Sequence, residues 1–311
     1  MVKYTLKRMF WAIVTILIIL FVLFLLLEFL PGSPFNDERL TPEQIAVLKA
    51  NYGLDRPFFE KALIFLKNAM RGDFGISYSV AKNLPVSMLV MERLGVSLRI
   101  GAQALILGTT MGIILGVIAG VKHNSWQDTI ATILAVIGVS VPSYVFALLL
   151  SYFVGYRLGW ADITFSLAAP FTSSILPTIS LSMFVMAQTA RFLRTELIDV
   201  LDSDYIQLAK AKGVKKFDLI YKHGFRNALI SVITIIGPLL VSLMTGSLVV
   251  EKVFGIPGIG SLLVNAINVK DYNIIVMIAF IYSTLYIVMN LGVDVLYGII
   301  DPRIRVEKGG N

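Results

Sequence analysis

The chain has 311 residues, of which 57% are hydrophobic and only 15% are charged, and its mean hydropathy is +0.80. Soluble domains are typically about 45–50% apolar and about 25% charged. The excess apolar residues form long runs, so the composition indicates an integral membrane protein. The net charge of +7 comes without a basic stripe interleaved with aromatic residues, which argues against nucleic-acid binding. The lack of cysteine excludes disulfides, thiolate metal sites and cysteine nucleophiles.

The first apolar run extends over Phe10–Leu30 and follows the cations Lys3, Lys7 and Arg8. A run of about 20 residues is long enough to span the hydrocarbon core of a bilayer. A signal peptide has a shorter apolar core and a cleavage site of small residues. We therefore predict that the N-terminal segment, residues 1–31, contains a retained first membrane helix that is also the targeting signal.

Residues 32–95 are predicted to form a small external subdomain between the first and second spans. Their charges are mixed, and the segment is too long for a simple loop. Thr41 is suited to cap a helix, with Pro42 at its first position and Gln44 completing a capping box. A second helix is predicted over Phe58–Met70, where apolar residues recur at helical spacing.

Five further apolar runs follow and predict an all-α polytopic protein with six transmembrane helices, whose five-helix core occupies 96–305. Pro142 and Pro238 predict kinks or local openings in the third and fifth spans. Glycines at four-residue intervals in the second span predict close helix packing rather than substrate contact. The five spans are placed at about Val96–Val121, Thr129–Tyr152, Ile175–Leu193, Ala228–Val250 and Ile274–Ile300, and the glycines are Gly108, Gly112, Gly116 and Gly120.

The distribution of cations predicts the topology. If the N-terminus is inside, the lysine-rich loop 195–227 is cytoplasmic, whereas the short external loops hold only Arg157, Lys252 and Lys270. Lys and Arg concentrate in cytoplasmic loops of membrane proteins. Both termini are therefore expected in the cytoplasm, with residues 306–311 as a cytoplasmic tail.

The loop 195–227 contains a predicted short helix. Ser203 or Asp204 is suited to cap it, and Gln207 lies three residues after Asp204, as in a capping box. Gly213 is well placed to end the helix. The segment from Asp204 to Gly213 would be about 15 Å long at the helical rise of 1.5 Å per residue.

One face of this short helix is predicted to carry Ile206, Ala209 and Gly213, which recur at three- and four-residue spacing. Two of these residues are small, so a partner could pack close to the backbone. The residues alone leave two interpretations open. The helix either docks onto a partner protein or lies at the lipid interface with its lysines toward anionic headgroups.

Family resemblance bears on this choice. The segments Ser203-Asp204-Tyr205, Ala209–Gly213 and His223–Leu229 resemble the EAA loop of ABC importer permeases, in the peptide-importer form (E/S)DYxxxAxAKG followed by HxxRNALxP. At the general Glu-Ala-Ala positions the chain has Gln207, Leu208 and Ala209, so the Glu and the first Ala are absent. Ser231 stands where the peptide-importer form usually has Pro.

Further fragments along nearly the whole chain are similar to the first, B-type, permease subunit of oligopeptide and dipeptide importers. Their order and spacing strengthen the resemblance beyond any single fragment. They are Leu30-Pro31-Gly32, Tyr52–Pro57, Gly72–Gly75, Glu92–Leu94, Val250–Phe254, Pro257–Gly260, Asp271-Tyr272, Asp294–Tyr297 and Asp301–Arg305.

The resemblance implies a type I ABC importer permease fold in a bacterial or archaeal inner membrane. It implies a second homologous permease subunit, two ATP-binding subunits, an extracytoplasmic binding protein docking on the outer loops, and membrane lipid as partners. Relatives of this pattern carry dipeptides, oligopeptides, nickel complexes or oligosaccharides. The ATPase-docking coupling helix would comprise Asp204, Tyr205, Ile206, Ala209, Lys210, Ala211, Lys212 and Gly213.

No catalytic constellation is found in the sequence. Without a Walker A pattern the chain is not expected to bind ATP in that way, so ATP and Mg²⁺ would be used by partner subunits and this chain would hold no cofactor. The separated His123 and His223 make a metal site improbable. The alternative function is a secondary transporter or channel that works alone, for which ion-coupling charges or a broken-helix repeat would be expected. Gln103, Gln188 and Asn290 are pathway-lining candidates, although interhelical hydrogen bonding is the commoner use of such residues.

Overall fold

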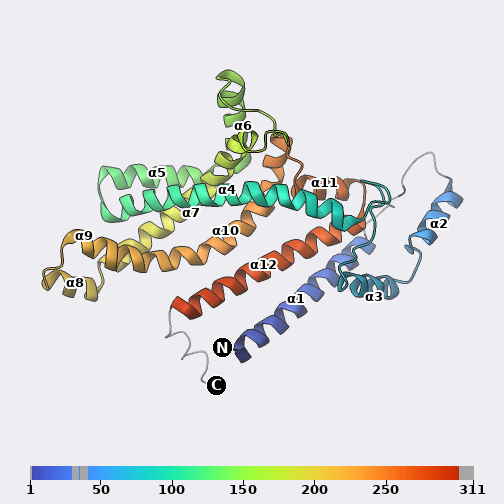
Figure 1. Ribbon diagram of the computed structural model, residues 1–311, viewed down its shortest axis with the longest axis horizontal. Coiled ribbons are helices and arrows are strands. Elements are labelled where there is room, and N and C mark those ends of the chain that lie inside the picture. Colours follow the sequence, from blue (N-terminus) through green and yellow to red (C-terminus); the bar gives the residue numbers. More distant parts are fainter. Residues whose placement is uncertain (1, 30–34, 36–40, 301–311) are drawn as a thin grey trace. The chain divides into compact units, whose positions relative to one another are not determined.

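The computed structural model describes residues 2–29, 35 and 41–300, and this part of the chain is nearly all helical, with one isolated bridge between Ile76 and Pro85 (Figure 1). The motifs expected at Leu30–Gly32 and Asp301–Arg305 and the tail 306–311 lie outside the described residues. The α-helices are α1 (Val2–Glu28), α2 (Pro42–Asn51), α3 (Phe58–Ala69), α4 (Val86–Val121), α5 (Trp126–Ser140), α6 (Ser143–Leu150), α7 (Ile175–Leu201), α8 (Asp204–Ala211), α9 (Lys216–Asp218), α10 (Arg226–Val253), α11 (Ile259–Asn268) and α12 (Tyr272–Ile300).

The chain divides into two compact units. Unit 1 comprises Met1–Val96 and Pro257–Val288, and unit 2 comprises Ser97–Ile256 and Met289–Asn311. Two π-helical segments, η1 (Ser151–Arg157) and η3 (Leu219–Phe225), and the short 3₁₀ helix η2 (Thr172–Ser174) complete unit 2.

In unit 1 the sequence-predicted start of α2 is confirmed. The Gln44 amide N–H donates to Thr41 Oγ1 at 3.3 Å, while the Thr41 amide donates to Gln44 Oε1 at 2.9 Å. This reciprocal capping box satisfies two of the donors that a helix start leaves free, and Pro42 occupies the first turn. The second predicted helix is also present, as α3.

Aromatic side chains join α3 to the end of α1. The Phe24 ring of α1 lies 5.7 Å from Phe65 of α3, and Phe65 lies 6.3 Å from Phe74. Phe74 in turn lies 5.2 Å from Phe280 of α12. Aromatic pairs at these centroid distances contribute about 0.5–1.5 kcal/mol each beyond the area they bury. Unit 1 is therefore assembled from segments at both ends of the chain.

In unit 2 the central element is α7, which packs against α5, α6 and α10. The glycine stripe of α4 lies against α7, and a Cβ added at Gly112 would lie 2.6 Å from Thr189 Cβ and 2.7 Å from the Met186 carbonyl oxygen. Gly108, Gly116 and Gly120 meet α7 in the same way. The predicted packing role of these glycines is confirmed, because a side chain at Gly108, Gly112 or Gly116 would clash with α7 and force the helices apart.

The kink predicted at Pro142 is confirmed. The axes of α5 and α6 differ by 100°, and Figure 1 shows α6 turning away from α5. Val141 is extended, with φ −89° and ψ 121°, as expected for a residue before proline. At Pro238, α10 stays helical through the proline, so no local opening is found there, and a kink at this residue stays a prediction. A 44° bend lies earlier, between Lys216–Leu229 and Val232–Leu243.

The described helices supply the apolar spans of a polytopic membrane protein. Three segments, Lys7–Glu28, Val86–Val121 and Tyr272–Gly292, are each long and apolar enough to cross a membrane, and two bent pairs raise the number to five. The predicted fourth span falls on α7, a continuous 27-residue helix with several polar side chains. The arrangement is consistent with six spans.

Candidate functional site

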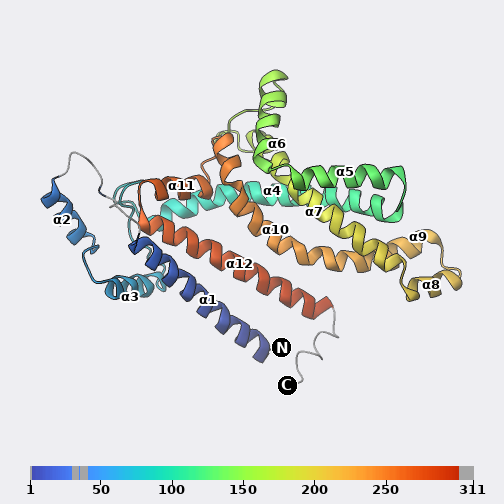
Figure 2. The same cartoon turned by 180° about the vertical axis from the view of Figure 1, so that it is seen from behind.

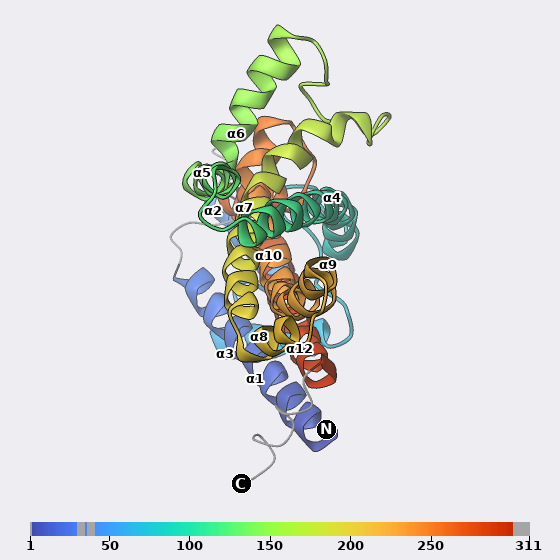
Figure 3. The same ribbon diagram turned by 90° about the vertical axis from the view of Figure 1, so that its left-hand side faces the viewer.

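The predicted helix of the 195–227 loop is present as α8. Only Asp202 and Ser203 separate it from the end of α7, so α8 follows that long helix after a two-residue link. Figure 3, in which the left-hand side of Figure 1 faces the viewer, shows α8 and α9 together at one end of α7 and α10. The same ends of α7 and α10 meet in the turned view of Figure 2.

The expected capping box at the start of α8 was wrong. Ser203, rather than Asp204, is the N-cap residue, and its hydroxyl donates to the Val200 carbonyl at 2.5 Å instead of capping the helix. The Gln207 side chain donates to the Asp202 carbonyl at 3.3 Å. The helix therefore begins one residue too early for an Asp204–Gln207 box, and its start is tied to the end of α7.

The end of α8 follows the prediction for Gly213. Its φ of +78° lies in the left-handed region, where glycine has no Cβ penalty. The Gly213 amide donates to the Lys210 carbonyl at 3.0 Å, and the Val214 amide donates to the Ala209 carbonyl at 3.2 Å. These two bonds form a Schellman motif, which satisfies carbonyls that a helix end leaves free.

The two faces of α8 differ from the sequence-based expectation. Of the face predicted to meet a partner, Ile206 is completely buried and turned into the chain, whereas Ala209 is half-buried and Gly213 exposed. The α8 helix packs there on η3, and Asn227 Nδ2 donates to the Tyr205 hydroxyl at 2.9 Å. Leu208 is 56% exposed and Tyr205 45% exposed. The available outer surface is therefore carried by Tyr205 and Leu208, with Ile206 as its anchor.

The remaining predicted residues of this helix share the outer side. Ala209 is half-buried, and the rest are exposed, namely Asp204, Lys210, Ala211, Lys212 and Gly213. The lysines that follow, Lys215, Lys216 and Lys222, are exposed as well. The outer surface of α8 is thus a small apolar patch within a cationic surround.

An aromatic pair continues this exposed surface on the segment after α8. Phe217 is 73% and Tyr221 59% exposed, and their rings stack with centroids 5.7 Å apart and planes 7° apart. Behind them the chain approaches α7 closely, because a Cβ at Gly224 would lie 3.0 Å from Leu201 Cδ2. We call Tyr205, Leu208, Phe217 and Tyr221 the exposed α8–η3 patch.

An ion pair that the sequence analysis did not predict joins α5 to α7. Arg194 Nε donates to Asp128 Oδ1 at 2.6 Å, and Arg194 Nη2 donates to Asp128 Oδ2 at 2.8 Å. Asp128 is 4% exposed. The sequence held one local signal, since Ser125 three residues before Asp128 marks a helix start, but no pattern pointed to Arg194.

The three pathway-lining candidates are not brought together by any described contact. The Thr178 hydroxyl of α7 donates to Gln103 Oε1 of α4 at 3.1 Å, which is an interhelical hydrogen bond. Gln188 on α7 and Asn290 on α12 are half-buried. Their lining of a pathway stays a prediction.

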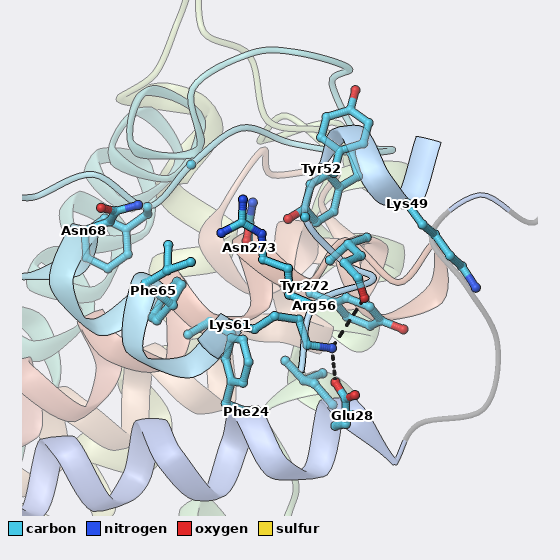
Figure 4. Close-up of a pocket in the computed structure, with 18 of the residues that line it drawn as sticks. Phe24, Glu28, Lys49, Tyr52, Arg56, Lys61, Phe65, Asn68, Tyr272 and Asn273 are labelled. Carbon is cyan, nitrogen blue, oxygen red and sulfur yellow. Dashed lines mark hydrogen bonds and ion pairs between the residues drawn. The ribbon is translucent and has the colours of Figure 1, made fainter. Parts of the chain in front are cut away.

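Unit 1 contains a pocket of about 480 Å³ beside the end of α1. Figure 4 shows Lys61 beside Glu28 in this pocket. The Lys61 ammonium donates to the Glu28 carboxylate at 2.7 Å and to the Leu54 carbonyl at 3.5 Å. Only 13% of the Lys61 side chain is exposed. The Lys61 side chain therefore links α3 to the end of α1.

Close to this pocket, burial raises the pKa of the Tyr78 phenol to about 12. A hydrogen bond with the Asn273 side chain opposes the increase, and the nearby Asp271 carboxylate adds to it. The phenol is thus held neutral by an apolar environment and a neighbouring negative charge.

Two family models match the chain. Residues 112–306 match the binding-protein-dependent transport system inner membrane component, and residues 1–100 match the N-terminal part of such membrane components. The helical, polytopic architecture is that of an ABC importer permease. The chain belongs to the family of binding-protein-dependent transport system inner membrane components, within its Opp/Dpp-type permeases.

Named relatives extend over essentially the full chain. A dipeptide transport system permease protein, DppB, of Lactococcus lactis is 40% identical over 98% of this chain and 100% of its own length. DppB of Bacillus subtilis is 41% identical over 100% of both chains. An oligopeptide transport system permease protein, OppB, of Haemophilus influenzae is 38% identical over 98% of this chain and 100% of its own length.

A solved structure of an amino acid ABC transporter shares the fold. Its TM-score is 0.52 at 16% identity, and the match covers 70% of this chain and 94% of that chain. At this identity the likeness concerns the fold alone. Together with the family match, it makes the chain a multi-pass inner-membrane protein with the ABC importer permease fold.

Proposed function

We propose that this chain is the B-type permease subunit of an ATP-driven importer of dipeptides or oligopeptides. The relatives that match it along its whole length are named as dipeptide and oligopeptide permeases. It would form half of the translocation pathway with a second homologous permease. Catalysis of ATP hydrolysis would belong to two ATP-binding partner subunits, with their ATP and Mg²⁺.

The observation that carries the coupling part of this proposal is the construction of α8. Its inner side is anchored by the fully buried Ile206, while Tyr205 and Leu208 face outward. Its C-terminus is closed by the Gly213 Schellman motif, so the helix is a short, stiff body on the end of α7. An amphipathic helix of this kind suits a groove on a partner protein.

The same proposal assigns the remaining surfaces. The loop 195–227 and both termini would be cytoplasmic, with the lysines on the inner side of the membrane. Residues 32–95 would form the external subdomain, and a substrate-binding protein would dock on it and on the other outer loops. The five-helix core over 96–305 would line the pathway.

Docking is tested by cysteine crosslinking in the assembled complex. Leu208→Cys should crosslink to a cysteine in the groove of the ATPase subunit, because Leu208 is 56% exposed. Ile206→Cys is the matched control on the same helix, and it should stay unreactive because Ile206 is buried. Crosslinking of neither position in an active complex would contradict docking through α8.

Transport itself is tested in proteoliposomes that contain this chain with or without its proposed partners. Peptide uptake should require the second permease, the ATPase subunits, the binding protein and ATP. Uptake by this chain alone would instead support the partner-independent transporter. Uptake driven by ATP but specific for a nickel complex or an oligosaccharide would retain the ABC mechanism and overturn the peptide substrate.

A further inference from the structure

We propose that the Asp128–Arg194 ion pair is a positioning contact that makes α5 move together with α7 when the ATPase subunits move α8. The proposal rests on the proposed docking role of α8. It assigns to the pair a part in coupling ATP hydrolysis to transport, beyond holding two helices together.

The geometry of the pair is that of a rigid contact. Two parallel hydrogen bonds of 2.6 and 2.8 Å join the Arg194 guanidinium to both carboxylate oxygens of Asp128. Such bidentate contacts fix orientation as well as distance. Asp128 also accepts the Asn124 amide at 3.0 Å and the Thr132 hydroxyl at 3.3 Å. The carboxylate is thus fastened to both the start of α5 and the side of α7.

Arg194 lies on α7, the helix that immediately precedes α8 in the chain. The α7 helix is continuous from Arg194 to Leu201, which is about 10 Å at the helical rise. Asp202 and Ser203 then lead into α8, and the Ser203 hydroxyl and the Gln207 side chain tie its start to residues at the end of α7. A displacement of α8 therefore reaches Arg194 through a stiff segment.

Between Arg194 and the next tight contact, the buried residues of the α5–α7 interface are small. A Cβ at Gly138 of α5 would lie 2.7 Å from Ala187 Cβ of α7, so the helices touch closely there. Nearer to Asp128, Ala135 and Ala190 pack with Ala187 in a buried apolar cluster, and a pocket of about 210 Å³ opens beside them. The buried members of this cluster are alanines, so the apolar packing toward the ion pair comes from small side chains.

Two separated contacts constrain two helices more than one contact does. With both the Gly138–Ala187 contact and the ion pair in place, α5 and α7 tilt as one body. Without the ion pair, only the contacts of small residues around Gly138 and Ala187 would oppose a pivot of α5 while α7 follows α8. The structure thus makes the ion pair the contact whose loss would separate the movement of α5 from that of α8.

A purely structural ion pair is the competing explanation, and stability data alone do not distinguish the two. The test therefore measures the ratio of ATP hydrolysed to peptide imported, in proteoliposomes containing the full complex. Arg194→Gln should retain ATP hydrolysis by the partner subunits but raise this ratio by about tenfold, a magnitude typical of coupling between sites. Arg194→Lys keeps the positive charge but loses the guanidinium that makes two parallel hydrogen bonds, so it should give a smaller increase in this ratio.

Further variants make the result decisive. Asp128→Asn keeps the side-chain shape and should also raise the ratio, and it replaces Arg194→Gln if that variant fails to assemble. The exchanged pair Asp128→Arg with Arg194→Asp should recover part of the coupling. The matched control is Thr129→Ala, which removes an exposed 3.2 Å hydrogen bond from the Thr129 hydroxyl to the Ser125 carbonyl next to Asp128 and should leave the ratio unchanged.

The outcomes separate this inference from the proposed function. If the wild-type chain does not bind ATPase subunits, the proposed function fails. If the wild-type complex is coupled and the assembled variants have the wild-type ratio, only the role of the pair is overturned. If neither Arg194→Gln nor Asp128→Asn assembles, the pair is a folding element and the coupling role is likewise overturned.

Discussion

The Ser77 hydroxyl donates to Asp271 Oδ2 at 2.6 Å, although the two residues lie in different parts of the sequence. The same oxygen accepts the amides of Ser79 at 2.9 Å and Val80 at 3.1 Å. Both Ser77 and Asp271 are completely buried. Asp271 immediately precedes α12, so this carboxylate fastens the 77–80 segment to the start of the last helix.

Removal of the carboxylate should destabilise unit 1. Asp271→Ala leaves the buried Ser77 hydroxyl and the amides of half-buried Ser79 and Val80 without their acceptor, and a buried unsatisfied group costs about 1–3 kcal/mol. We expect a lower thermal midpoint in detergent and faster proteolysis of the 77–80 segment. Asp271→Asn should be milder, because Asp271 Oδ1 has no hydrogen-bond partner among the described residues and an amide nitrogen could occupy its place. Equal loss in both variants would contradict this account.

The α4–α7 contact should not accept a side chain at Gly112. Gly112→Val would place atoms within 2.6 Å of Thr189 Cβ, and overpacking of this kind typically costs about 1–3 kcal/mol. The expected result is a reduced yield of folded protein and a lower thermal midpoint. Gly101→Val in the same helix is the matched control, since an added Cβ there meets nothing within 4 Å among the described residues. Similar losses in both variants would argue against tight packing at Gly112.

A substitution that disfavours the left-handed conformation at Gly213 should destabilise only the end of α8. Gly213→Ala adds a Cβ that meets no described atom within 4 Å, so its cost is backbone strain of about 1–2 kcal/mol. Hydrogen exchange of the Val214 amide should accelerate, because this amide closes the Schellman motif. Gly213→Asn should exchange more slowly than Gly213→Ala, since asparagine tolerates this conformation. Unchanged exchange in both variants would contradict the assigned motif.

Stability at alkaline pH should depend on Tyr78. The unfolded phenol loses its proton near its ordinary pKa of 10, whereas the folded phenol keeps it until about pH 12. The folded state therefore binds more protons between these values, and its stability falls as the pH rises through this window, by about 2–3 kcal/mol in all. Below pH 10 the group contributes no pH dependence.

Tyr78→Phe removes this titration while other groups titrate as before. Thermal midpoints of the wild type and of Tyr78→Phe, measured in detergent from pH 9 to about 12, should therefore converge or cross as the pH rises. Parallel curves across the whole range would show that the phenol is not held neutral.

Local signals in the sequence predicted local structure well. The capping box of Thr41, the helix end at Gly213 and the kink at Pro142 each depend on residues within a few positions of one another. The spacing of the α4 glycines also predicted their packing, because a small-residue stripe has one common use between membrane helices. The fold class followed from the lengths of the apolar runs.

Contacts between distant segments could not be predicted in this way. Nothing in the sequence pairs Asp128 with Arg194 or Ser77 with Asp271, since each pair forms only when separate helices pack. Burial of Ile206 was missed for the same reason. Helical spacing shows which residues share a face, but whether that face meets the chain itself or a partner depends on tertiary packing.

The division of the chain into two packed units affects which truncated forms of this protein should fold. The family matches divide it between residues 100 and 112, whereas unit 1 takes in both Met1–Val96 and Pro257–Val288. A chain begun at about residue 100 would retain Asp271 and Phe280 but lose the donors and the ring that cover them. The N-terminal segment is therefore expected to be needed for stable packing of α12. Supplying residues 1–100 as a separate polypeptide should restore the stability that is lost when this segment is deleted.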